Sequence, residues 1–125
     1  MKTAIEIKHF DHAEWINKLK LYKNEIVSLE GSLEEIATKS NKREVLARVE
    51  HFQNQLIVQQ DNIDMLKHEI NVDNDAINAE IKKNDFVLEP RRMKDHLVTG
   101  KNIKSFEKVF NELKTELNTF LSRWM

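Results

Sequence analysis

The chain has 125 residues, which suits one folded domain spanning residues 1–125. Charged residues make up 33% of it, but they cancel to a net charge of −1, so no overall field favours nucleic acid or a membrane surface. The absence of cysteine excludes disulfides and thiolate chemistry. The presence of only two glycines and one proline predicts long helices joined by few turns.

The first predicted helix covers residues 4–39. Its seam positions alternate by three and four residues, which is the spacing of a coiled-coil seam. They are Ile5, Lys8, His12, Trp15, Leu19, Tyr22, Ile26, Leu29, Leu33 and Ile36. Gly31 lies inside this pattern without shifting its phase, so we expect one continuous helix, and a new helix start at Gly31 and Ser32 is the alternative.

The second predicted helix covers residues 42–84, after a tight reversal at Ser40 and Asn41. Asn41 followed by Glu44 has the spacing of a capping box, in which each side chain bonds the backbone N–H of the other. The apolar pattern then continues without glycine or proline. Its members are Val45, Val49, Phe52, Leu56, Ile63, Leu66, Ile70, Ile77 and Ile81.

The third predicted helix covers residues 91–124, after a second reversal that includes Asn84, Asp85 and Glu89. Pro90 suits the first position of a helix because its missing N–H has no partner there. The seam positions are Ile103, Phe106, Phe110, Leu113, Leu117, Phe120 and Trp124. Gly100 either lies within one helix or separates a short helix from a main one, and we favour one helix that ends with Trp124 as a plug.

Short connections force neighbouring helices to run antiparallel. The sequence therefore predicts an all-α protein, an elongated up-down-up three-helix bundle with coiled-coil-like heptad seams.

Heptad counting along the second predicted helix gives a second apolar line, about 130° round the helix from the main seam. This line holds His51, Val58, Met65, Val72 and Ala79, and Ile57 lies beside it. Exposed apolar lines mark interfaces, so we expect His51, Ile57, Val58, Met65 and Val72 to contact another copy of the chain, most simply in a homodimer. The alternative is that the line forms the edge of a wide apolar arc within one bundle.

Three polar seam residues, one from each predicted helix, converge at one end of such a bundle: His12, Asp73 and His96. Imidazole and carboxylate groups bind zinc, iron and other divalent metals, so these residues are candidate metal ligands, with His9 and Glu69 nearby. The alternative, which the sequence favours, is a polar layer in which histidine bonds aspartate and fixes the register of the helices.

Basic residues gather around the second reversal, and phosphate groups are what such a cluster binds. They are Lys82, Lys83, Arg91, Arg92, Lys94, Lys101 and Lys104. No aromatic residues interleave with them and acidic residues lie among them, so we expect a solvated end rather than a nucleic-acid interface.

Catalytic motifs such as a glycine-rich phosphate loop, a nucleophile elbow or a His-Glu-x-x-His zinc motif are missing from the sequence. We therefore expect a non-enzymatic protein without a cofactor, acting through self-association or through an unidentified protein partner. A metal- or small-ligand-binding bundle is the first alternative, and a nucleic-acid-associated module is the second.

Stretches of apolar sequence stay short of the roughly 18 residues that span a membrane, and the N-terminus lacks the apolar core of a signal peptide. Together with the absence of cysteine, this leads us to expect a cytoplasmic protein.

Overall fold

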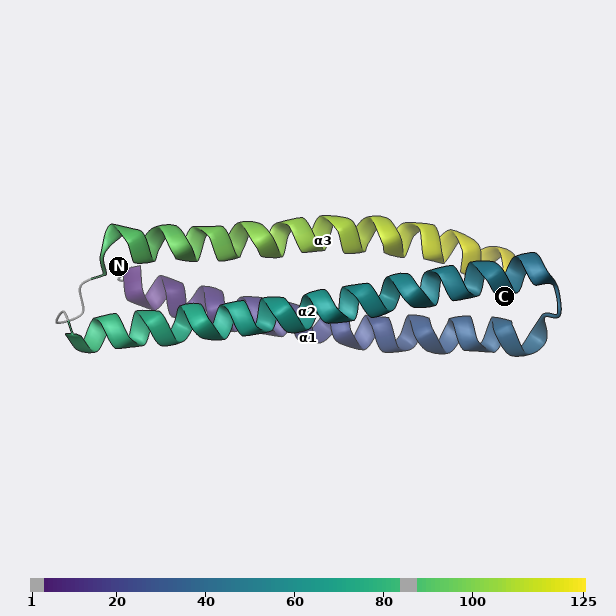
Figure 1. Ribbon diagram of the computed structural model, residues 1–125, viewed down its shortest axis with the longest axis horizontal. Coiled ribbons are helices and arrows are strands. Elements are labelled where there is room, and N and C mark those ends of the chain that lie inside the picture. The colour runs from purple at the N-terminus through teal and green to yellow at the C-terminus, as the bar shows by residue number, and fades with distance from the viewer. Residues whose placement is uncertain (1–3, 84–87) are drawn as a thin grey trace.

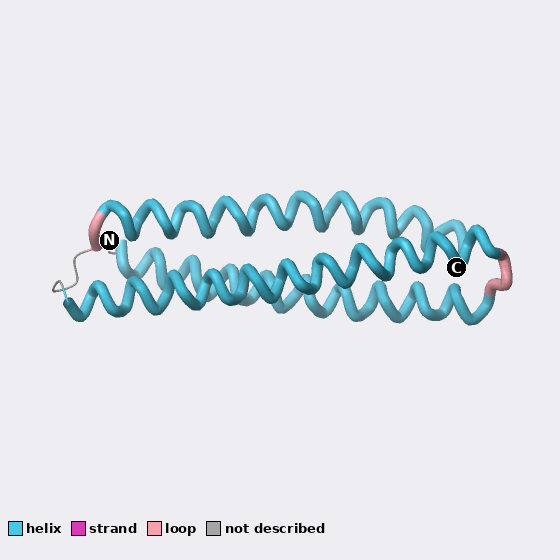
Figure 2. The backbone as a smooth tube through the Cα atoms, viewed as in Figure 1, coloured by secondary structure: helices cyan, strands magenta, loops and turns pink. Residues whose placement is uncertain are grey.

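Three long helices form an elongated antiparallel bundle in the computed structural model, which describes residues 4–83 and 88–125, with side chains from residue 8 onward. Helix α1 runs over Ala4–Lys39, α2 over Arg43–Lys83 and α3 over Pro90–Trp124. The chain reverses at opposite ends between successive helices, as Figures 1 and 2 show. The predicted up-down-up three-helix bundle is confirmed.

The first reversal is closed by Ser40 rather than by the predicted cap Asn41. The backbone N–H of Lys42 donates to Ser40 Oγ at 3.2 Å, and that of Leu46 donates to the Lys42 carbonyl at 3.0 Å. The first helical carbonyl therefore belongs to Lys42, and α2 begins at Arg43, one residue after the predicted start.

The second reversal ends at Pro90, which takes the first position of α3 as the sequence predicted. Glu80, near the end of α2, ties the two helices together: its carboxylate accepts bonds from the Glu89 backbone N–H at 2.6 Å and from Arg92 Nε at 3.1 Å. The predicted turn residues Asn84 and Asp85 lie outside the described residues.

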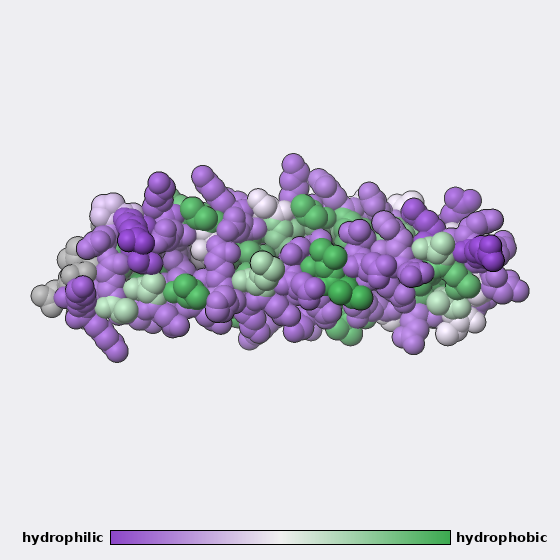
Figure 3. Space-filling model, in the orientation of Figure 1, coloured by the Kyte–Doolittle hydropathy of each residue, from purple (hydrophilic) through white to green (hydrophobic). Residues whose placement is uncertain are grey.

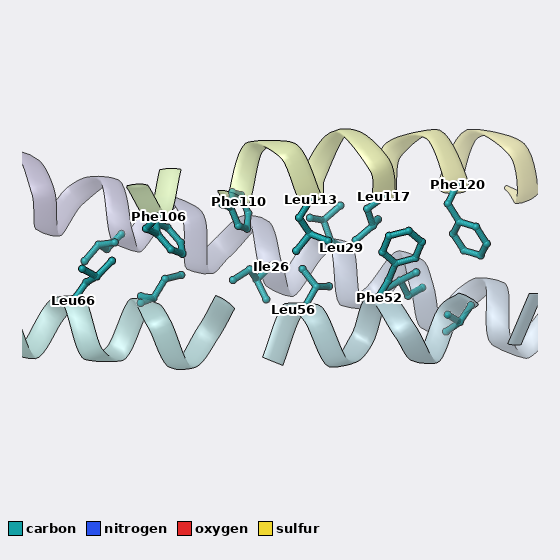
Figure 4. Close-up of a cluster of buried hydrophobic side chains, with 14 of the residues drawn as sticks. Ile26, Leu29, Phe52, Leu56, Leu66, Phe106, Phe110, Leu113, Leu117 and Phe120 are labelled. Carbon is teal, nitrogen blue, oxygen red and sulfur yellow. The ribbon is translucent and has the colours of Figure 1, made fainter. Parts of the chain in front are cut away.

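The core is a row of apolar side chains along the seams of all three helices. Phe52 from α2 and Phe110, Leu117 and Phe120 from α3 belong to this row, and Figure 4 shows them pointing inward from their helices. Burying a side chain of this size contributes roughly 1.5–3 kcal/mol, so the row accounts for the association of helices that could not persist alone.

Trp124 does not plug the end of the bundle. It is exposed over 37% of its surface, and its ring packs beneath Lys42 and Arg123 at 5.2 and 5.5 Å. These long side chains therefore shield part of a ring that remains partly open to solvent.

Both glycines lie inside continuous helices, as favoured from the sequence. A Cβ at Gly31 would meet nothing within 4 Å, whereas a Cβ at Gly100 would lie 3.2 Å from Cζ2 of Trp15. Gly100 therefore lets the Trp15 ring pack close to the α3 backbone, next to the polar residues of the seam.

Candidate functional site

A buried polar cluster lies near the end of the bundle where α2 leads into α3, with one residue from each helix. The Asp73 carboxylate oxygen Oδ2 lies 2.7 Å from His12 Nε2 and 2.7 Å from His96 Nδ1. The three side chains are only 6%, 5% and 3% exposed for His12, Asp73 and His96. The heptad pattern produces this convergence because all three residues occupy seam positions at the same level of the bundle.

The outer nitrogen of each histidine also faces an oxygen. His96 Nε2 lies 2.9 Å from Asp11 Oδ2, and His12 Nδ1 lies 3.2 Å from Asn74 Oδ1. A ring nitrogen that carries a proton can donate to each of these oxygens, so each histidine is held from both sides.

Aromatic rings hold these histidines in place. The rings of Trp15 and His96 lie 4.8 Å apart at an angle of 31°, and the rings of His12 and His96 lie 5.0 Å apart. Because Gly100 admits the Trp15 ring, that ring covers His96 on the side of the α3 backbone. The histidines are therefore fixed by packing as well as by hydrogen bonds.

One atom of the cluster lacks a partner. Asp73 Oδ1 is buried and accepts no hydrogen bond from the described residues. A buried carboxylate oxygen left unpaired costs free energy, on the order of 1–3 kcal/mol, so it calls for an explanation.

The sequence correctly predicted which three residues form the centre of this cluster, but not all of the residues around them. His12, Asp73 and His96 come together as expected. Of the two nearby candidates, His9 is exposed with its ring 6.1 Å from that of His12. Glu69 instead accepts a bond from Asn102 Nδ2 at 2.8 Å and lies outside the three-residue group.

Three residues that contact the histidines were not predicted from the sequence: Asp11, Asn74 and Trp15. Asp11 and Asn74 directly adjoin His12 and Asp73 in the sequence, which was the one available signal. Polar residues beside a seam are ordinary solvent-facing residues in most bundles, so that signal is weak.

A second candidate site is an apolar surface where α2 and α3 lie side by side. Val58, Met65 and Val72 of α2 are exposed, Met65 over 69% of its surface, and Val98 and Val109 of α3 are about half exposed. We call these five residues the α2–α3 face. Figure 3 shows hydrophobic side chains reaching the surface along the middle of the bundle, over these two helices.

Two shallow grooves run along the α2–α3 face. One, of about 320 Å³, has Met65 and Val109 on its opposite walls, and the other, of about 260 Å³, has Val72 and Val98. The two valines of α3 were not predicted, because they are eleven residues apart and form no heptad line.

The other predicted interface residues, Val58, His51 and Ile57, line neither groove. His51 is exposed, with its ring 5.4 Å from that of Phe52. Ile57 is half exposed and lies about 100° round the helix from Val58.

Part of the basic end is neutralised within the chain. Arg92 contacts Glu80 at 3.1 Å and Asp95 at 3.3 Å, so its guanidinium is already engaged by two carboxylates. Lys82 and Lys83 are exposed. This end is thus a mixed surface rather than a uniformly positive one.

Comparison of the chain with protein-family models, with curated proteins and with solved structures finds no match.

Within residues 4–83 and 88–125, no helix combines the length and the apolar character needed to cross a membrane.

Proposed function

We propose that this protein has a non-enzymatic role and acts by helix-to-helix association, with a second copy of itself as the partner. The association uses the α2–α3 face, and the observation that carries the proposal is the exposed row of Val58, Met65 and Val72 beside the α2–α3 grooves. Contiguous apolar surface of this kind is costly to leave in water.

The spacing of that row favours a second copy. Val58 and Val72 each lie seven residues from Met65, so two antiparallel α2 helices related by a two-fold axis would place Met65 against Met65. Each Val58 would then meet the Val72 of the other copy. A two-fold dimer requires a surface that is complementary to itself in this way.

The chemistry of the larger groove is also that of an interface core. Of its nine lining residues, Glu69 alone is charged, in a chain that is 33% charged overall, and its carboxylate is already bonded to Asn102. Depletion of charge is the compositional mark of interface centres.

Sedimentation equilibrium at tens of micromolar tests the proposal. The wild-type chain is expected to sediment at twice the 14.8 kDa mass of one chain. Met65→Lys is expected to sediment near 14.8 kDa, because it would put two ammonium groups against each other at the two-fold axis.

Val27→Lys is the matched control, because Val27 is an exposed apolar residue of α1 away from the α2–α3 face. This variant is expected to keep the wild-type mass. A monomeric wild type, or equal loss of mass in both variants, contradicts the proposed role of the face.

A further inference from the structure

We propose that His12, Asp73 and His96 bind a divalent first-row transition-metal ion. The donors are His12 Nε2, the Asp73 carboxylate and His96 Nδ1, which all lie within 4.8 Å of one another. Each helix supplies one donor, so the ion would join all three helices at one level of the bundle.

The donor set selects the class of ion. Two imidazole nitrogens and a carboxylate suit Zn²⁺, Fe²⁺ and their neighbours, whereas Mg²⁺ and Ca²⁺ require oxygen donors. Bonds of about 2.0–2.1 Å to a tetrahedral ion place the donors about 3.3 Å apart. The two nitrogens each lie 2.7 Å from Asp73 Oδ2 and within 4.8 Å of each other, so the rings would move away from that oxygen to admit the ion.

The outer partners match those of a metal-bound histidine, which donates its free N–H to an oxygen acceptor. Asp11 and Asn74 provide these acceptors for His96 and His12. The ion would bind the ring nitrogens that face Asp73, and the outer N–H of each ring would remain free to donate to Asp11 or Asn74.

The unpaired oxygen of Asp73 gives an independent reason for a ligand. Asp73 Oδ1 is buried and without a hydrogen bond among the described residues, and it can complete the coordination as a second carboxylate donor. The groove of about 260 Å³ between α2 and α3 has Asp73 and Thr99 in its lining, so it offers an entry path from solvent.

Calorimetric titration of tag-free, metal-stripped protein with Zn²⁺ tests the proposal. We expect one saturable site per chain. The variants His12→Gln and His96→Asn keep an amide N–H that can donate to Asp73, and we expect each to weaken binding by more than about 100-fold, since outer-shell partners alone are worth about 10–100-fold. Circular dichroism checks that both variants remain helical.

The matched control removes the other three histidines together, as His9→Ala, His51→Ala and His68→Ala. These residues are exposed, so the triple variant is expected to bind Zn²⁺ as tightly as the wild type. Zinc binding that disappears in the triple variant arises from surface histidines and overturns the proposal. Wild-type protein that binds no stoichiometric zinc overturns it as well.

Asp11→Asn extends the test to a residue that touches no metal. Asp11 is only partly buried, so its replacement leaves the helices intact and weakens the acceptor for His96 Nε2. We expect Zn²⁺ binding about 10–100-fold weaker than wild type. Unchanged affinity in this variant, together with unchanged affinity in His96→Asn, overturns the assignment of His96 as a ligand.

Discussion

The apolar middle of the bundle and the polar cluster at its end are equally buried, yet they are held together by different forces. In the middle, Phe106 and Phe110 pack among other apolar side chains, and any arrangement that excludes water gains free energy. At the end, Asp73 has to meet two histidines at hydrogen-bond distance for the cluster to be tolerated.

The apolar side chains therefore account for the stability of the bundle, whereas the polar cluster has to be explained by a more specific role. Replacing a buried charged cluster by well-packed apolar residues is often neutral or stabilising, so the cluster is a costly way to join helices. A sequence that builds a heptad seam from apolar residues and then interrupts it on all three helices at one level indicates a role other than stability. Fixing the register of the helices and binding a metal are two such roles. Both depend on directional polar contacts, which apolar packing does not provide.

The largest expected effect comes from the apolar middle. Phe110→Ala is expected to lower the free energy of unfolding by about 3–5 kcal/mol, because it leaves a cavity in a tightly packed layer. The ring is fully buried and lies 5.0 Å from that of Tyr22. Urea unfolding followed by circular dichroism measures the loss. A loss below about 1 kcal/mol would mean that this layer is loosely packed.

Asp73→Ala breaks the polar cluster, and the expected loss is about 3 kcal/mol, since it leaves two buried histidines without their shared acceptor. The unfolding is measured with a chelator present, so that bound metal contributes nothing.

Replacing the cluster completely should have the opposite sign. The triple variant His12→Leu, Asp73→Leu and His96→Leu is expected to gain about 1–4 kcal/mol under the same conditions, because it removes all three buried polar side chains of the cluster together. If the triple variant instead loses as much as Asp73→Ala, the cluster stabilises the bundle outright and the contrast between the two regions fails.

Heptad spacing made the core and the three-residue cluster predictable. Spacing determines which residues face inward, and two short reversals determine their level along the bundle. Heptad spacing could not predict that Asp11 contacts His96. The rotamer of a residue beside the seam decides whether its side chain faces solvent or a neighbouring helix. The role of Gly100 was also ambiguous in the sequence. Only the packed position of the Trp15 ring shows that the missing side chain makes room for it.

Alanine substitutions at the two glycines are expected to change stability less, and their effects can be compared directly. Gly31→Ala is expected to stabilise by about 1 kcal/mol, because alanine is the better helix former and its Cβ meets open space. Gly100→Ala offers the same helical gain, but its Cβ would press on the Trp15 ring at 3.2 Å. Thermal unfolding of both variants should therefore show a higher midpoint for Gly31→Ala alone. Equal gains would mean that the Trp15 ring moves freely.

The smallest effect concerns a polar group within the apolar middle. Tyr22 packs against Phe110, and its hydroxyl donates to Glu107 Oε2 at 2.8 Å. Burial, and then the bond to Glu107, raises the pKa of Tyr22 from 10.0 to about 12. The folded state therefore holds this proton more tightly than the unfolded state, so its stabilising contribution is complete below pH 10 and is lost as the pH rises toward 12.

Tyr22→Phe removes that titration, so the difference in free energy of unfolding between wild type and variant isolates it. All other titratable groups are the same in wild type and variant. We expect a constant difference up to about pH 10, and above it a steady fall in the stability of the wild type relative to the variant. A difference that stays constant to about pH 12 would mean that the hydroxyl faces water instead of Glu107. The bond between Tyr22 and Glu107 would then add nothing to the contacts of the apolar middle.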